Sequence, residues 1–333
     1  MLEHGGNLQQ AAQQYGRPLT DWLDVSTGIN PQHYPIPALA PALFQRLPPA
    51  TDTLHAAARK YYGCQHVLAC AGSQAALQLL PTLRAPCRVA MPHTMYQEHA
   101  HAWQRAGHQV QFFEQTPDSD TLNQSDVLLV CNPNNPTGHV YPPDTLLGWH
   151  AQLAARGGWL VVDEAFMDST PQHSLASHTG QTGLWVLRSL GKFFGLAGLR
   201  VGFLLGEPTA LAQVESLLGP WTITGPSQMI ASQALADHDW QQLMRGHLPA
   251  QSRQLAQVLN QHELKPAGGT DLFQYVLHPA SRELQQALAK EGIWTRYFES
   301  PSALRFGLPP ANEWSRLAQA LRHVTQQLSD SQP

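Results

Sequence analysis

The 333-residue sequence has few charges and very few lysines. Asp, Glu, Lys and Arg make up 13% of the chain, against ~25% in an average globular domain. The net charge is −4 and no block of basic residues occurs, which argues against a nucleic-acid partner. With 43% apolar residues, the chain is expected to fold rather than to stay disordered. Chemistry that needs a primary amine has four candidates: Lys60, Lys192, Lys265 and Lys290.

The sequence also lacks an apolar run of ~18 residues, so no membrane-spanning helix is expected. Its first residues have neither the basic nor the apolar region of a signal peptide. The four cysteines form no CxxC pair and are interpreted as reduced thiols, so we expect a cytoplasmic protein. Among the 17 histidines, His93, His99 and His101 lie close in sequence. Their spacing matches no zinc pattern, and no metal site is expected.

From about His66, short apolar runs alternate with longer amphipathic segments. This rhythm is typical of buried parallel strands joined by crossover helices. The last two runs are too close together for a helical crossover, which predicts an antiparallel pair. The predicted strands are Val67–Cys70, Arg88–Met91, Gln109–Phe113, Val127–Cys131, Trp159–Asp163, Leu184–Ser189 and Arg200–Leu205.

After Pro226 the pattern changes to helices and short strands, which predicts a second, smaller domain. A long helix is expected near 227–261, with Pro249 as a break or kink. The segments expected after it are a strand at 272–277, a helix at 281–291, a strand at 303–307 and a helix at 311–328.

The predicted fold class is therefore α/β. It has a largely parallel seven-stranded sheet with helices on both faces, plus a smaller α+β C-terminal domain. We place an N-terminal arm at residues 1–25, the large domain at 26–243 and the small domain at 244–333. Asn7 is a candidate N-cap for a first helix within the arm.

Ligands of such sheets bind beyond the carboxyl ends of the strands, so the residues that follow each strand matter most. Gly72-Ser73-Gln74 follows the first strand and opens a helix. Glycine lets the backbone approach a ligand, and free N–H groups at a helix start favour an anion. These residues form either a phosphate cup or an ordinary capped turn. The chain contains no Walker A loop.

Two further strand ends carry polar residues. The segment Asn132–Gly138 is rich in Asn and Pro. It is either a tight turn or a stiff loop that holds the Asn135 amide in place. Asp163 ends an apolar strand, where a carboxylate needs a partner. It either caps the next helix or faces a protonated ring nitrogen.

Lys192 differs from the other three lysines in its surroundings. Lys60 and Lys290 lie in amphipathic segments and Lys265 precedes a proline, so these three are interpreted as surface residues. Lys192 follows a predicted strand and is flanked by glycine and phenylalanine. Apolar surroundings disfavour the charged amine, which suits a nucleophile that forms a Schiff base.

Taken in order, these motifs resemble the aspartate-aminotransferase-like family of pyridoxal-phosphate enzymes, fold type I, over nearly the whole chain. The resemblance implies pyridoxal 5′-phosphate as cofactor and a homodimer. It makes Lys192 the Schiff-base lysine and Asp163 the partner of the pyridine nitrogen, with His99 supporting Asp163. Tyr96 would stack on the ring and Asn135 would bond its phenolate. The residues implied to hold the cofactor phosphate are Gly72, Ser73, Gln74, Ser189 and Arg200.

Two positions depart from the usual pattern of that family. Phe166 stands where many of its transaminases have a tyrosine that bonds the ring phenolate. Leu47 stands where relatives have a tyrosine that reaches the cofactor phosphate of the partner subunit.

Three segments narrow the resemblance to the threonine-phosphate decarboxylases of cobalamin synthesis: His4–Asn7, Asp163–Phe166 and Gly268–Phe273. The implied reaction is decarboxylation of L-threonine O-3-phosphate to (R)-1-amino-2-propanol O-2-phosphate and CO2. In that resemblance the N-terminal arm lies over the active site and binds the substrate phosphate, whereas most chain termini are frayed. The residues implied to bind substrate are His4, Gly5, Gly6, Asn7, Asn135, Arg296 and Arg305.

Two other functions stay open at the level of sequence. The nearest neighbour of these decarboxylases is histidinol-phosphate aminotransferase, which also binds a phosphorylated amine. A non-catalytic binding or regulatory protein on the same fold is the alternative from another class. The presence of both Lys192 and Asp163 argues against it.

Overall fold

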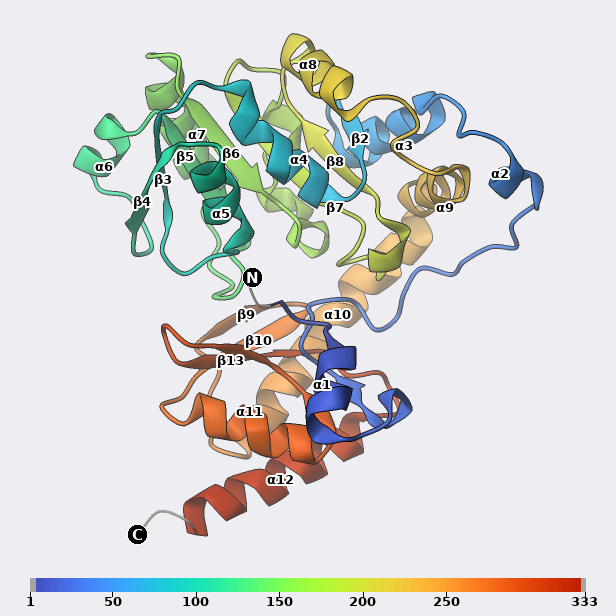
Figure 1. The fold of residues 1–333 in the computed structure, drawn as a ribbon, viewed down its shortest axis with the longest axis vertical. Helices are drawn as coiled ribbons and strands as arrows, with labels where there is room; N and C mark the ends of the chain where they lie inside the picture. The colour runs from blue at the N-terminus through green and yellow to red at the C-terminus, as the bar shows by residue number, and fades with distance from the viewer. Residues whose placement is uncertain (1–3, 331–333) are drawn as a thin grey trace. The chain divides into compact units, whose positions relative to one another are not determined.

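The computed structural model describes residues 4–330 (Figure 1). By its internal contacts the chain divides into two compact units. Within the described residues, unit 1 holds 4–32, 136–138 and 244–330, and unit 2 holds 33–135 and 139–243. The N-terminal residues therefore group with the C-terminal ones. The expected position of the arm over the active site stays a prediction.

Unit 2 is built on a seven-stranded sheet with the strand order β2-β8-β7-β6-β5-β3-β4. Neighbouring strands are parallel except at β8, which pairs antiparallel with both β2 and β7. The predicted sheet, including its antiparallel pair, is thus confirmed. Its strands are β2 (Leu68–Cys70), β3 (Arg88–Pro92), β4 (Gln109–Phe113), β5 (Val127–Cys131), β6 (Trp159–Asp163), β7 (Leu184–Ser189) and β8 (Gly202–Leu205).

Helices cover both faces of this sheet, because alternate residues of each strand point to opposite sides. Leu129 and Cys131 of β5 pack in one apolar cluster with residues of α4, α5 and α8. Leu128 and Val130 are fully buried on the opposite side, the side that α7 covers (Figure 1). The helices of unit 2 are α2 (Ala42–Gln45), α3 (Asp52–Tyr62), α4 (Ser73–Leu79), α5 (Glu98–Arg105), α6 (Ser119–Gln124), α7 (Pro143–Ala154), α8 (Pro208–Leu218) and α9 (Gly225–Ala236).

Unit 1 contains a four-stranded antiparallel sheet with the order β12-β13-β10-β9, and a short parallel pair of β1 with β11. Asn7 caps α1, since its side chain accepts a hydrogen bond from the Gln10 amide. The prediction of a helix-and-short-strand domain is confirmed. Its elements are α1 (Leu8–Tyr15), β1 (Leu23–Asp24), β9 (Gly268–Thr270), β10 (Phe273–Leu277), α11 (Ser281–Lys290), β11 (Ile293–Trp294), β12 (Arg296–Phe298), β13 (Ala303–Gly307) and α12 (Trp314–Asp330).

The long helix expected near 227–261 is two helices, and the prediction of a break at Pro249 is wrong. The chain interrupts at Asp237, and α10 (His238–Asn260) then runs through Pro249 without ending. The Asp237 carboxylate accepts from the Trp240 amide at 3.0 Å and so starts the second helix. Proline removes one backbone donor, and this helix tolerates the loss at that position.

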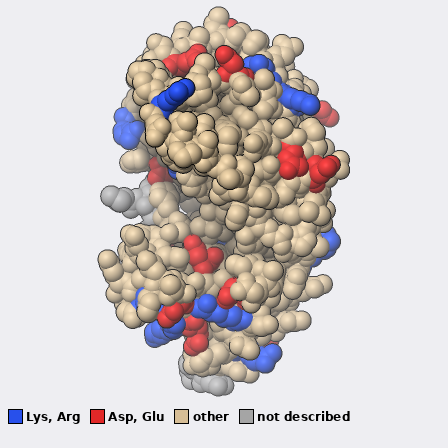
Figure 2. Space-filling view, turned by 90° about the vertical axis from the view of Figure 1, so that its right-hand side faces the viewer, with Lys and Arg blue, Asp and Glu red and all other residues tan. Residues whose placement is uncertain are grey.

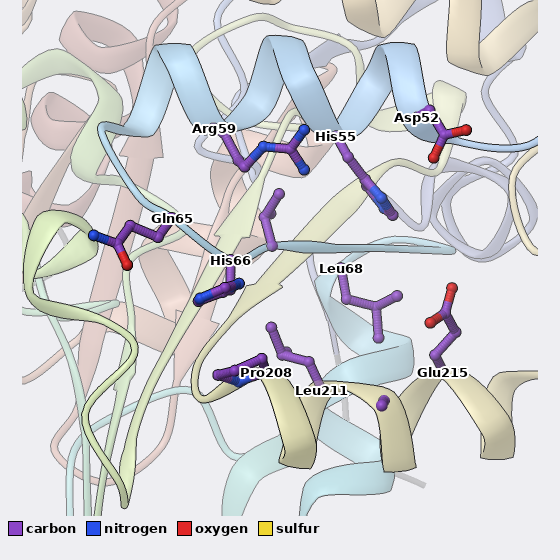
Figure 3. A pocket seen from close by; sticks show the side chains of 11 residues that line it. Asp52, His55, Arg59, Gln65, His66, Leu68, Pro208, Leu211 and Glu215 are labelled. Atoms are coloured by element: carbon purple, nitrogen blue, oxygen red, sulfur yellow. The ribbon is translucent and has the colours of Figure 1, made fainter.

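A groove of about 320 Å³ lies in unit 2 between α3, β2 and α8. Figure 3 shows His55 and Arg59 of α3 on one side, Glu215 of α8 on the other and Leu68 of β2 between them. On the face drawn in Figure 2, acidic and basic side chains are scattered, with no continuous patch of either sign. No helix within residues 4–330 has the length and apolarity to cross a bilayer.

Candidate active site

The polar strand ends singled out in the sequence lie at one edge of the unit 2 sheet. β2, β5, β6 and β7 all point the same way, since two antiparallel pairings relate β2 to β7 through β8. Gly202, at the start of β8, pairs with both Cys70 and Ser189. The segments after β2 and β7 therefore meet on either side of β8.

A buried carboxylate–imidazole pair stands at the end of β6. His99 Nε2 lies 2.8 Å from Asp163 Oδ2, and the two residues are 1% and 7% exposed. The other oxygen, Asp163 Oδ1, accepts from the Ala165 amide at 3.0 Å. The Asp163 carboxylate is thus held in one orientation by α5 and by its own loop. The role of His99 as support for Asp163 is consistent with this contact.

Cys131 joins the same cluster. Its thiol, His99 and Asp163 each offer a ligand atom within 4.8 Å of the others, a grouping that sequence spacing could not reveal. Burial raises the pKa of the Cys131 thiol well above its usual value, so the thiol stays protonated. The Asp163 carboxylate of this cluster, held by His99, suits a cationic ring nitrogen.

Lys192 follows β7 in a loop walled by aromatic rings. Its Nζ lies 5.5 Å from the ring centroid of Phe166, which is three residues after Asp163 in the adjacent loop. Phe193 and Phe194, the next two residues in the chain, are fully buried. Lys192 is half-buried, and the other three lysines are exposed. The amine and the carboxylate expected to act together therefore belong to neighbouring strands of one sheet edge.

The turn after β2 is closed tightly around Arg200. Gly72 has φ 75°, and a Cβ on it would lie 2.6 Å from the Arg200 guanidinium. A Cβ on Gly202 would lie 2.2 Å from the Ser73 amide nitrogen. Only glycine fits at both places. The structure thus brings Gly72, Ser73 and Arg200 together, as a phosphate cup requires.

The other predicted cofactor residues lie in the same unit. Tyr96 donates its hydroxyl proton to Gln74 Oε1 at 3.2 Å. Gln74 Nε2 in turn donates to Glu98 at 3.0 Å. Ser189 Oγ accepts from the Gly191 amide at 3.2 Å. Burial raises the pKa of Tyr96, which keeps its ring neutral.

The Asn-Pro loop after β5 is held by side-chain contacts, as expected of a stiff loop. Asn132 accepts from the Tyr141 amide at 2.9 Å and donates to the Tyr141 carbonyl at 3.2 Å. Asn134 Nδ2 donates to the Thr94 carbonyl at 2.8 Å. Asn135 ends this braced segment and is partly buried. Its contact with a ring phenolate stays a prediction.

The predicted substrate residues outside this loop lie in unit 1. Arg305 of β13 is 7% exposed, and its Nη2 donates to the Ser26 carbonyl at 2.7 Å. Arg296 of β12 pairs in register with Arg305. The Gly6 amide donates to Ser26 Oγ at 2.7 Å, and Gly5 belongs to the same turn. His4 is exposed.

Comparison with known proteins places this geometry in a family. The profile of the family described as "Aminotransferase class I and II" matches residues 38–324. The chain belongs to this family. It is 52% identical to the threonine-phosphate decarboxylase of Pseudomonas aeruginosa over 96% of this chain and 97% of the relative. It is 42% identical to the threonine-phosphate decarboxylase of a Sinorhizobium species over 97% and 98%.

A solved structure shares the fold at low identity. The histidinol-phosphate aminotransferase of Sinorhizobium meliloti, in complex with pyridoxal 5′-phosphate, has a TM-score of 0.82 at 18% identity. The alignment covers 98% of this chain and 99% of that one. The fold type I architecture expected from the sequence is confirmed.

The residues of unit 2 fit pyridoxal 5′-phosphate, the cofactor of this aminotransferase family. Asp163 is a buried carboxylate with His99 behind it, as a protonated pyridine nitrogen needs. Lys192 is half-buried and its amine lies near the Phe166 ring, apolar surroundings that suit a Schiff-base amine. The turn at Gly72 has no room for a side chain and keeps backbone amides and Arg200 close together.

A second buried cluster lies on the other side of the strands that carry this candidate site, and sequence reasoning missed it. Arg188 of β7 bonds Glu164 Oε2 and Asp168 Oδ1, each at 2.5 Å, and all three side chains are at most 2% exposed. Ser174 Oγ and the Leu175 amide also donate to Glu164. The signal was present: an arginine inside the apolar run Leu184–Ser189 and a second acid beside Asp163 both need buried partners.

Proposed function

We propose that the protein is a pyridoxal-phosphate-dependent decarboxylase of cobalamin biosynthesis. It converts L-threonine O-3-phosphate to (R)-1-amino-2-propanol O-2-phosphate and CO2. The observation that carries this proposal is the full-length similarity to threonine-phosphate decarboxylases, joined to an intact Lys192 and Asp163–His99 pair. The sequence similarity to a curated histidinol-phosphate aminotransferase covers less of the chain, 64% at 32% identity, and the structural match to such an enzyme, at 18% identity, shows the fold alone.

The bound cofactor supplies an electron sink for the pair released when the Cα–carboxylate bond breaks. Asp163 keeps a proton on the ring nitrogen, which strengthens that sink, and His99 fixes the Asp163 carboxylate. Lys192 would hold the cofactor through Nζ and, once the substrate amine has replaced it there, would donate a proton to Cα. Tyr96 covers the ring and Asn135 bonds its phenolate. Gly72, Ser73, Gln74, Ser189 and Arg200 hold the phosphate.

Unit 1 supplies the groups that bind the substrate. Arg305 grips the α-carboxylate with the fork of its guanidinium. The turn at His4–Asn7 and Arg296 receive the substrate phosphate. Asn7 already caps α1 and the Gly6 amide already bonds Ser26, so the phosphate takes the remaining donors of the turn. These contacts would hold the substrate at its carboxylate and at its phosphate.

We also propose a homodimer in the cytoplasm. Large apolar side chains of unit 2 are exposed in and after α2 and in the turn before α9: Phe44 67%, Leu47 68% and Trp221 59%. Such exposure is typical of an interface. Sedimentation of Leu47→Glu, with Leu277→Glu of unit 1 as the matched control (Leu277 is 49% exposed), tests the dimer.

The four free cysteines support a reducing compartment.

The reaction is tested by incubating the holoenzyme with phosphothreonine and measuring CO2. Release of CO2 with no keto acid present supports the decarboxylase. Glutamate formation from phosphothreonine and 2-oxoglutarate, absent in the no-substrate control, would replace it with an aminotransferase. Visible absorption of the protein-bound cofactor should vanish in Lys192→Ala and persist in Lys265→Ala. No such absorption in the parent protein would favour the non-catalytic alternative.

A further inference from the structure

Ser26 is a fully buried serine that no motif singled out. It follows β1 and lies at the centre of a hydrogen-bonded chain within unit 1. The Gly6 amide donates to Ser26 Oγ at 2.7 Å, and Ser26 Oγ donates to Asp24 Oδ1 at 2.6 Å. The Ser26 amide donates to the same Asp24 oxygen at 2.8 Å. The hydroxyl is therefore acceptor and donor at once, and the carboxylate polarises it.

The backbone of Ser26 reaches in the other direction, to the β13 arginine. Arg305 Nη2 donates to the Ser26 carbonyl at 2.7 Å. This bond fixes one edge of the guanidinium and so orients its remaining donors. One residue thus contacts both the N-terminal turn through its side chain and Arg305 through its carbonyl.

Glycines let these three segments approach closely. A Cβ on Gly5 would lie 2.4 Å from the Ser26 carbonyl oxygen. A Cβ on Gly307, two residues after Arg305, would lie 2.0 Å from the Thr27 carbonyl oxygen. Real side chains do not pack at such distances, so the crossing depends on glycine at both positions.

We propose that Ser26 is a positioning residue that ties the N-terminal turn to Arg305 and thereby sets the spacing between the phosphate and carboxylate contacts of the substrate. The proposal rests on the proposed function for the roles of the two groups it connects. On this proposal, unit 1 selects substrates by the distance between their phosphate and their carboxylate. We expect L-threonine and L-serine O-phosphates to fit this spacing and O-phosphohomoserine, longer by one methylene, to fit it poorly.

The test compares Ser26→Ala with the parent holoenzyme. Ser26→Ala removes two hydrogen bonds, the one from the Gly6 amide and the charge-assisted one to Asp24. This loss should raise KM for phosphothreonine about tenfold, with kcat and the visible absorption of the cofactor unchanged. The preference for phosphothreonine over phosphohomoserine should fall by a similar factor. Gly5→Ala, whose Cβ would lie 2.4 Å from the Ser26 carbonyl oxygen and so displaces the turn while the Ser26 hydroxyl is kept, should act alike. Ser302→Ala, which removes a hydroxyl that bonds the His278 carbonyl in the same unit, is the matched control.

Hydrogen exchange of the peptide covering residues 4–8 gives a readout independent of activity. It should accelerate in Ser26→Ala and stay unchanged in Ser302→Ala. Unchanged exchange would overturn the proposal that Ser26 holds the turn. So would a fall in kcat, or a rise in KM that is equal for both substrates. A parent protein that releases no CO2 would defeat the proposed function alone, because exchange still decides whether Ser26 holds the turn.

Discussion

Arg188→Met should destabilise unit 2 severely. The substitution keeps a side chain of similar length but leaves Glu164 and Asp168 as two buried acids without their cation. Removing one member of a buried ion pair costs about 3–5 kcal/mol, because the remaining charge is desolvated and unpaired. The guanidinium also lies 4.5 Å from the Tyr62 ring centroid, a contact worth about 0.5–2 kcal/mol. The sum is a large share of the ~5–15 kcal/mol of a typical domain.

An exposed ion pair supplies the control for the expected loss of stability in Arg188→Met. Arg282 and Glu299 approach to 3.4 Å with side chains 55% and 82% exposed. Such pairs contribute about 0–1 kcal/mol, so Arg282→Met should leave stability almost unchanged. A second variant, Arg188→Met with Glu164→Gln and Asp168→Asn, removes all three charges. Its amide oxygens can still accept from Leu175 and Tyr61, so it should regain most of the loss.

Urea unfolding followed by tryptophan fluorescence and by far-ultraviolet circular dichroism measures these effects. The two units make a single transition uncertain, so midpoints are compared only where both probes coincide. A loss of less than about 1 kcal/mol in Arg188→Met, or a triple variant as unstable as the single one, would refute the reasoning from buried charge.

Three further predictions concern Glu164, His55 and Gly72. Burial raises the pKa of Glu164 above 4.5. Its contribution to stability is therefore complete below pH 4.5 and is lost as pH rises through the raised pKa, and Glu164→Gln should flatten the stability profile in that range. Burial lowers the pKa of His55, whose Nε2 accepts from the Ala69 amide at 3.0 Å. Stability should fall as pH drops below 6.5, where the unfolded chain takes up the proton first, and His55→Gln should remove that slope in acid titrations. Gly72→Ala places a Cβ at φ 75° and 2.6 Å from the Arg200 guanidinium. Strain of about 1–3 kcal/mol should weaken cofactor binding about 5- to 150-fold, measured by equilibrium dialysis. Gly198→Ala, with nothing within 4 Å of its Cβ, should keep the parent affinity; equal affinity in both variants contradicts the close-packed cup.

The sheet was predictable because its signals are local. β5 and β6 are continuous apolar runs, and their bounds match the predicted ones. The polar residues that end them stand out against that background. The break expected at Pro249 does not occur, because α10 continues through this residue. Whether a proline ends a helix depends on whether the helix can lose one backbone donor, and the local sequence does not show that.

Contacts between distant segments were not predictable. Arg188 bonds acids 20 and 24 residues away, and Arg305 bonds a carbonyl 279 residues away. From the sequence, each of these arginines is expected only to need a hydrogen-bond or ion-pair partner. The identity of the partner depends on strand order and register, which one sequence does not specify.

The alternation of β strands explains why the two sides of this sheet edge serve different ends. Residues 161, 187 and 131 face the apolar cluster with α4 and α5, so Asp163 and Ser189 fall on that side by the two-residue period. Arg188 falls on the opposite side, where it bonds Glu164. One side of β6 and β7 therefore carries the residues proposed to bind the cofactor, and the other side carries the ion pair between Arg188 and Glu164. Asp163→Asn should then impair catalysis with little loss of stability, since it removes a charge that the ring nitrogen needs. Arg188→Met should do the reverse, and any loss of cofactor affinity it causes should scale with the loosening of the strand ends.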